Sequence, residues 1–231
     1  MRKWLKKYID PVCPLFGIIP LLACFALNMI VYSGTMILCR DWTHYDLTLD
    51  FDRSIPLVPG WIYIYLGCYL FWIANYVMAA RINRHDKTSF YRFVATDMMS
   101  RLVCAVFYLG FPTTNIRPEF HADSLSSHLL TFVYSIDQPT NLFPSIHCLV
   151  SWLCFIVIRD SKSVKTAYKI FSCIFALLVV ASTQFTKQHY ILDAVAGILL
   201  AELLWFINQK TSLYRLVKKP FELWNHKLHL D

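Results

Sequence analysis

A histidine and an aspartate four residues apart stand at the start of the last long apolar stretch of this sequence. They are His189 and Asp193, in STQFTKQHYILDAVAG, residues 182–197. Side chains with this spacing share one face of a helix, so the carboxylate can accept a hydrogen bond from one ring nitrogen. That bond would fix the imidazole tautomer and leave the other nitrogen free to attack. The pair predicts a nucleophilic histidine, His189, oriented by Asp193.

A second histidine follows a helix-start signal in NLFPSIHC, residues 141–148. His147 comes directly after Pro144, Ser145 and one isoleucine. Proline is favoured near helix starts, and the free amides there attract an anion. Ser145 suits a phosphate hydrogen-bond donor. As a hydrolase nucleophile paired with His147 it is disfavoured, because side chains two apart on a helix point away from each other.

Two cations complete a set of groups suited to phosphate. Arg117, in TTNIRPEF (residues 113–120), offers a planar fork for phosphate oxygens, and Lys187 offers a point charge. The combination fits phosphoryl transfer through a phosphohistidine: His189 attacks and His147 protonates the leaving oxygen. The cationic groups would hold the other phosphate oxygens as charge spreads over them. The predicted phosphate-binding residues are therefore Arg117, Ser145 and Lys187.

Two simpler interpretations compete with this one. A single histidine at a membrane interface often has no chemical role, and six others are left unassigned: His44, His85, His121, His128, His226 and His229. Zinc binding by His147 and His189 is the other alternative. Only Asp193 offers a third ligand, and the orienting role already uses it, so neither a metal nor a cofactor is assigned.

The composition predicts that membrane helices position these residues. Of 231 residues, 57% are hydrophobic and 16% charged, which indicates an all-α integral membrane protein. Six apolar stretches approach the roughly 20 residues that a span requires, at about 15–38, 58–80, 92–111, 145–159, 167–184 and 189–207. We therefore expect a bundle of six transmembrane helices in a multi-pass protein of the cell membrane.

The distribution of positive charge predicts how this bundle is oriented. Seventeen of the 22 lysines and arginines lie before the first stretch, in the 81–92 and 159–169 connections, or after the last stretch. Four lie in the other connections, and Arg101 lies inside a span. By the positive-inside rule both termini are cytoplasmic. This distribution accounts for the net charge of +7 without a nucleic-acid partner.

The same crossings predict that the polar clusters meet. Arg117, His147 and His189 all fall at the ends of spans that face away from the cytoplasm, so the active site is expected on that side. The chain is a single domain over 1–231, with an interfacial segment at 1–14 and a basic cytoplasmic tail at 208–231. The sequence is silent on oligomeric state.

Two further patterns carry structural predictions. Residues 124–137 place four apolar side chains on one helical face, typical either of a helix at the bilayer surface, as a lid or lipid entrance beside a site, or of one that packs against the rest of the protein. Asp97 and Arg101 share a face of the third span, and Glu202 lies at similar depth in the sixth. Because charges in hydrocarbon tend to find partners, we expect these three to form one buried ion network.

The three clusters together resemble the signature of the type 2 phosphatidic acid phosphatase superfamily, which also includes vanadium haloperoxidases. That signature reads Lys-x6-Arg-Pro, then Pro-Ser-x-His, then Ser-Arg-x5-His-x3-Asp. Arg117-Pro118 matches the end of the first block, residues 144–147 match the second, and Ser182, His189 and Asp193 match the third. The resemblance covers nearly the whole chain. It implies a six-helix fold and a metal-independent phosphohistidine route at a site facing away from the cytoplasm.

Two positions depart from that signature, and two others resemble one branch of the superfamily. Gly110 stands where the first block has lysine, and Thr183 where the third has arginine, so Lys187 is the candidate substitute for a missing cation. Ile146 and Tyr190 resemble the inositol phosphorylceramide synthase and sphingomyelin synthase branch. That branch moves a phospho-headgroup between lipids.

Three functions remain open at this point. The first is a membrane lipid phosphatase that hydrolyses a lipid phosphomonoester or pyrophosphate, with water resolving the phosphohistidine. The second is a phospholipid headgroup transferase, in which a lipid alcohol resolves it. The third is a non-catalytic lipid-binding or transport protein on the same scaffold. The expected partners are a phosphorylated lipid and the bilayer.

Overall fold

Apolar helices carry most of the chain in the computed structural model, which describes residues 2–230 and only the backbone of Arg2. The principal helices are α2 (Leu15–Leu38), α4 (Ile62–Ile82), α5 (Lys87–Gly110), α7 (Ile146–Arg159), α8 (Thr166–Phe185) and α9 (Ile191–Lys210). Side-chain caps start two of them: Asp86 accepts from the Thr88 amide before α5, and Ser145 accepts from the Cys148 amide before α7. Met1 and Asp231, the ends of the expected domain, lie outside the described residues.

Five helices in the described part of the chain are long and apolar enough to cross a membrane. They are α2, α4 together with the short helix η2 (Pro59–Trp61), α5, α8 and α9. The sixth candidate, α7, has 14 residues. At about 1.5 Å per residue it covers roughly 21 Å, less than the roughly 30 Å of a hydrocarbon core. The prediction of an all-α fold is confirmed, and five helices have the length and composition of membrane spans; the sixth span and the orientation of the termini stay predictions.

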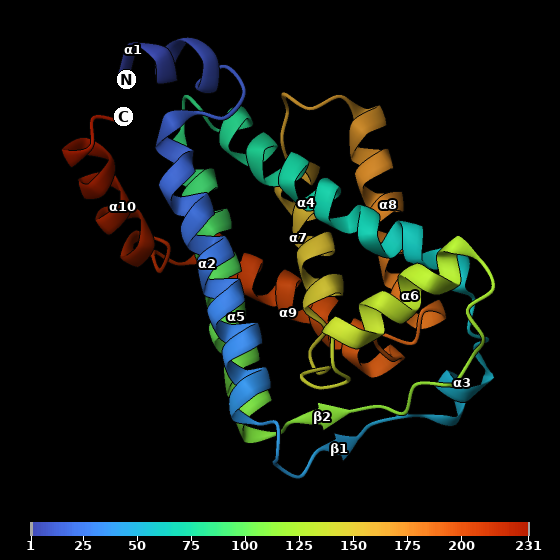
Figure 1. Cartoon of the computed structure of the whole chain (residues 1–231). Coiled ribbons are helices and arrows are strands. Elements are labelled where there is room, and N and C mark those ends of the chain that lie inside the picture. The colour runs from blue at the N-terminus through green and yellow to red at the C-terminus, as the bar shows by residue number, and fades with distance from the viewer. Residues whose placement is uncertain (1, 231) are drawn as a thin grey trace.

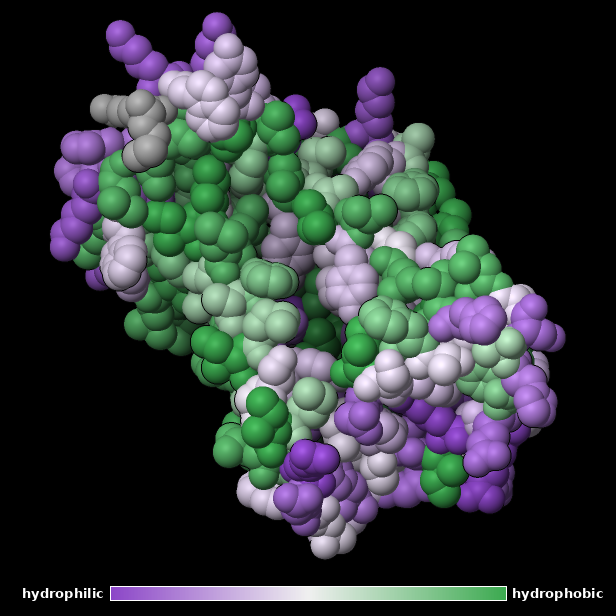
Figure 2. Space-filling view, in the orientation of Figure 1, coloured by the Kyte–Doolittle hydropathy of each residue, from purple (hydrophilic) through white to green (hydrophobic). Residues whose placement is uncertain are grey.

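The burial of α7 explains why it has the composition of a span. It packs between α4, α8 and α9 near the centre of the bundle (Figure 1), and 11 of its 14 residues are buried. In the other five helices, at most half of the most apolar segment is buried. Figure 2 shows those apolar side chains along the flanks of the helices, with hydrophilic groups gathered toward the ends. A helix enclosed by other helices is apolar on every side without meeting lipid.

The short elements divide between the two ends of the bundle. One end carries β1 (Tyr45–Asp46), α3 (Asp50–Ser54), β2 (Thr113–Thr114) and α6 (Leu125–Ile136). The β1 and β2 strands pair in parallel, with Tyr45 opposite Thr113. The other end carries α1 (Arg2–Trp4), the π-helix η1 (Leu5–Ile9) and α10 (Arg215–Lys227), so both ends of the chain lie there (Figure 1).

Two segments outside the bundle are helical. The amphipathic helix expected at 124–137 is confirmed as α6, whose Leu125, Phe132 and Ile136 are exposed while Leu130 and Val133 are buried. Most of the basic tail at 208–231 forms the helix α10. Its apolar and charged residues separate on two faces, and Leu216, Leu223 and Trp224 of the apolar face are exposed.

Of the three residues expected in one ion network, Asp97 and Arg101 pair as predicted, whereas the prediction for Glu202 is wrong. Arg101 pairs with Asp97 at 2.7 Å, and both are buried. Glu202 does not join them: it binds Arg159, at the end of α7, at 2.6 Å, and accepts from the Trp152 indole. Glu202 takes a different partner because α7 is short enough to end beside it.

Candidate active site

Two helix starts bring the histidines together. His147 is the second residue of α7, and His189 lies two residues before α9. Their ring centroids are 5.6 Å apart. The amide of Ser145, which precedes α7, donates to the carbonyl oxygen of Asp193, in the first turn of α9, at 3.0 Å. This backbone bond fixes the two helix starts against each other, and only 9% of His147 and 6% of His189 are exposed.

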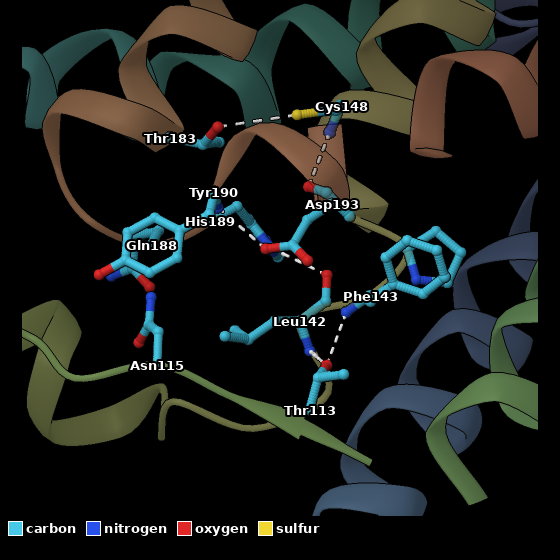
Figure 3. A network of polar contacts seen from close by, with 12 residues as sticks. Thr113, Asn115, Leu142, Phe143, Cys148, Thr183, Gln188, His189, Tyr190 and Asp193 are labelled. Atoms are coloured by element: carbon cyan, nitrogen blue, oxygen red, sulfur yellow. Dashed lines mark hydrogen bonds and ion pairs between the residues drawn. The ribbon is translucent and has the colours of Figure 1, made fainter. Parts of the chain in front are cut away.

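One ring nitrogen of His189 faces two acceptors (Figure 3). The Leu142 carbonyl oxygen lies 3.1 Å from Nδ1, whereas Asp193 Oδ2 lies 3.7 Å away and accepts from the Tyr190 amide at 2.9 Å. Leu142 is held in turn by Thr113, whose hydroxyl oxygen accepts from its amide. The Leu142 carbonyl therefore lies closer to Nδ1 of His189 than the Asp193 carboxylate does, although we expected Asp193 to make this contact. Both acceptors favour a proton on Nδ1 and leave Nε2 as the nucleophilic nitrogen.

Aromatic side chains of α4 surround His147. Tyr65 stacks on its ring with centroids 4.6 Å apart, and Trp72 lies 5.4 Å away. The Tyr69 hydroxyl is 3.5 Å from Nε2 of His147. Sequence analysis did not identify these three residues. Their i, i+4, i+7 spacing places them on one helical face, so an aromatic stripe was the available signal.

Asp137, also missed, connects this aromatic group to the rest of the site. It follows α6, and its carboxylate accepts hydrogen bonds from the hydroxyls of Tyr32 and Tyr65. Its backbone oxygen accepts from Arg117 Nη1 at 2.5 Å. Asp137 thus connects Tyr32 of α2 and Tyr65 of α4 to Arg117, and no nearby sequence pattern indicated this.

Arg117 binds the residue that precedes His189, and its guanidinium is already engaged. Nη2 donates to Gln188 Oε1 at 2.6 Å, and the group sits 4.3 Å over the Tyr134 ring. Its Nε has no hydrogen-bond partner among the described residues. Gln188 directly precedes His189 in the chain, so Arg117 is connected to the proposed nucleophile through the side chain of its neighbour.

The other two predicted phosphate ligands make contacts within the protein. Lys187, at a φ of 54°, donates from Nζ to the backbone oxygen of Asp52 at 2.7 Å. Burial lowers the pKa of Lys187, while the Asp52 carboxylate acts in the opposite direction. Ser145 Oγ accepts from the Cys148 amide at 3.3 Å and is fully buried. Phosphate binding by Lys187 and Ser145 stays a prediction.

The two positions that depart from the phosphatase signature have different surroundings. A Cβ at Gly110 would meet no atom within 4 Å. Thr183 is fully buried, donates to the Val180 carbonyl at 2.8 Å and lies 3.7 Å from the Cys148 sulfur. A longer side chain has room at Gly110 and none at Thr183. Across residues 2–230, no group of three or more histidine, cysteine or acidic side chains is arranged to hold a metal ion, so the zinc alternative lacks a third ligand.

Gly197 sets how closely α7 and α9 approach. A Cβ there would lie 2.5 Å from the Ser145 carbonyl oxygen and 3.2 Å from the Leu149 amide nitrogen. That oxygen accepts the first hydrogen bond of α7, from Leu149. The absence of a side chain at this position therefore lets the turn that carries His147 rest on the helix that follows His189.

Comparison with known proteins assigns this arrangement to a family. No curated protein and no solved structure matches the chain. A family model described as the PAP2 superfamily matches residues 56–207. The match includes both histidines, Asp193 and Arg117, and it extends over well over half of the sequence. Members are generally phosphatases or phosphotransferases, and the chain belongs to the PAP2 superfamily.

Proposed function

We propose that the protein is a membrane lipid phosphatase that works through a phosphohistidine on His189. Nε2 of His189 attacks the terminal phosphorus of a lipid phosphomonoester or pyrophosphate, and the N–P bond forms as the P–O bond to the lipid alcohol or lipid monophosphate breaks. His147 gives its proton to the departing oxygen. Arg117 stabilises the charge that develops on the other phosphate oxygens.

Water completes the cycle. It attacks the phosphorus of the phosphohistidine and transfers a proton to His147, which is then ready to act as the acid again. The N–P bond breaks and inorganic phosphate leaves. No metal or cofactor takes part in this scheme. The site faces away from the cytoplasm in the cell membrane, where the phosphate of a lipid lies at the depth of the two histidines.

The observation that carries this proposal is the pairing of the two imidazoles. Their centroids are 5.6 Å apart, and Nδ1 of His189 is turned toward the Leu142 carbonyl and Asp193. Because these contacts fix the tautomer of His189, that histidine can act as the nucleophile and His147 as the acid. Arg117, bound to the side chain of the residue before His189, adds a cation at this end of the bundle.

Changing the leaving group tests the two roles separately. His147→Ala should slow release of an alkyl lipid alcohol by about 10²–10⁴-fold, the typical contribution of a general acid. A lipid-like aryl phosphate, whose leaving group needs no proton, should recover most of that loss. His189→Ala should turn over neither substrate and should trap no acid-labile phosphohistidine. The scheme is wrong if both variants respond alike to the leaving group, or if His189→Ala keeps its activity.

Limited access for water favours headgroup transfer as the second candidate. Both histidines are nearly buried, and Ile146 and Tyr190 beside them are buried as well. A lipid alcohol that enters from the bilayer could then resolve the phosphohistidine in place of water. Labelled lipid phosphate, incubated with and without acceptor lipid, separates the two: free phosphate supports hydrolysis, and a new labelled lipid supports transfer. A non-catalytic lipid-binding or transport protein would produce neither.

A further inference from the structure

Two neighbouring cavities lie at the end of the bundle away from the histidines. The larger, about 530 Å³, is lined by residues of α5 and α10: Lys87, Tyr91, Lys219, Glu222, Asn225 and His226. We name it the α5–α10 cavity. The smaller, about 270 Å³, lies against the N-terminal segment and shares Lys87. At about 1.5 Å per residue, Lys87 is roughly 30 Å along α5 from Tyr108, which bonds Pro144 beside the active site.

Positive charge dominates the α5–α10 cavity. Its one acidic side chain, Glu222, is offset by Lys218 of the same helix, 3.7 Å away. Lys87 and Lys219 have no carboxylate partner within 4 Å in the described structure, and the Lys87 ammonium lies over the Phe16 ring at 4.8 Å. A cavity of a few hundred Å³ with two such ammonium groups suits a phosphate-bearing ligand.

The cavity wall also contains buried polar atoms that lack hydrogen bonds. Tyr91 is 0% exposed, and its hydroxyl lies near the side chain of Asn225, whose Oδ1 is also buried. Neither atom makes a hydrogen bond of ordinary geometry to any described residue. Asn225 is itself held, because its amide nitrogen donates to the Phe16 carbonyl at 2.8 Å. An unpaired buried hydroxyl is costly, and a phosphate oxygen would accept its hydrogen bond.

The exposed side chains of α10 indicate that the phosphate group bound in the cavity would belong to a membrane lipid. Leu216, Leu223 and Trp224 are exposed, at 73%, 63% and 61%. Basic residues share the helix: Arg215, Lys218, Lys219 and Lys227. Exposed Trp4 and Tyr8 lie at the same end of the molecule (Figure 1). Apolar side chains with tryptophan beside lysines are typical of a helix in the membrane interface, where lipid headgroups meet the lysines.

We propose that the α5–α10 cavity binds the headgroup of an anionic phospholipid, with Lys87 and Lys219 against its phosphate and Tyr91 donating to it. The acyl chains would cover the apolar face of α10. Because α10 contacts both α2 and α5, a bound lipid would fasten the C-terminal helix to the bundle. This site is separate from the histidines and does not depend on the reaction proposed for them.

Lipid-dependent thermal stability of the full-length protein tests this proposal. In detergent micelles at physiological salt, phosphatidylglycerol should raise the Tm of the wild type, and phosphatidylcholine should not. Native mass spectrometry should show one retained phosphatidylglycerol. Lys87→Gln with Lys219→Gln should weaken this binding about thirtyfold, as expected for two lysines near an anionic lipid surface. Tyr91→Phe, which keeps the ring, should reduce the binding and leave the fold intact.

A matched pair of variants controls for net charge. Lys162→Gln with Lys165→Gln removes the same charge from a connection that does not line the cavity, and it should bind phosphatidylglycerol like the wild type. Three results would overturn the proposal. They are equal stabilisation by both lipids, unchanged binding in both the Lys87/Lys219 and the Tyr91 variants, or an equal effect of soluble glycerol phosphate, which would indicate a site for free phosphate.

Discussion

The close contact at Gly197 gives a direct test of how the two histidines are positioned. In Gly197→Ala the new Cβ would lie 2.5 Å from the Ser145 carbonyl oxygen, where ordinary contacts begin at 3.4 Å. That oxygen belongs to the backbone, so a side-chain rotation cannot relieve the clash. The first turn of α7, which carries His147, must move about 1 Å away from α9.

The size of that movement sets the expected loss. A displacement of about 1 Å in a catalytic arrangement can cost roughly 100-fold in rate, and we expect a loss of this order in kcat. Overpacking destabilises by about 1–3 kcal/mol, against about 1 kcal/mol gained because alanine favours a helix more than glycine does. The free energy of unfolding should therefore fall by no more than about 2 kcal/mol, and the variant should fold.

Phosphate release from a lipid phosphate, measured beside thermal unfolding in the same detergent, separates the two effects. Gly34→Ala is the matched control, because Gly34 is also inside a helix and a Cβ there meets nothing within 4 Å. It should keep wild-type turnover and the same or higher stability. If folded Gly197→Ala turns over within about twofold of the wild type, the contact does not position the histidines and our account of the site is wrong.

Three other substitutions address the groups around the site and in the bundle. Arg117→Lys cannot hold the Asp137 carbonyl and the Gln188 side chain at once, so kcat/KM should fall about tenfold or more in steady-state assays; unchanged kinetics would contradict this. Asp137→Asn weakens two tyrosine hydrogen bonds, by about 0.5–1.5 kcal/mol each. It should lower Tm and slow turnover, and Asp137→Glu should not rescue it as well as the native residue. Arg101→Met leaves Asp97 buried without its partner, so thermal unfolding should show a loss of about 3–5 kcal/mol. Adding Asp97→Asn should recover most of that loss, and a variant that loses activity at unchanged stability would refute the structural role.

The sequence by itself determined the fold class and most of the helices. Long apolar stretches have few alternatives to helices when they must satisfy their own backbone hydrogen bonds in lipid. It also selected His147, His189 and Asp193, because helix-start signals and i, i+4 spacing are local, and Arg117, because a guanidinium suits phosphate oxygens. The tertiary structure brings these residues to the same end of the bundle.

Only the tertiary structure decided which partners these residues take. Leu142 contributes a backbone oxygen to His189, and a carbonyl has no signature in the sequence. Asp137 reaches Tyr32 across more than 100 residues, and Glu202 pairs with Arg159 because α7 ends early. Such contacts depend on helix lengths and on close approaches like that at Gly197. Local spacing places a residue on a face of its helix, whereas packing decides what that face meets.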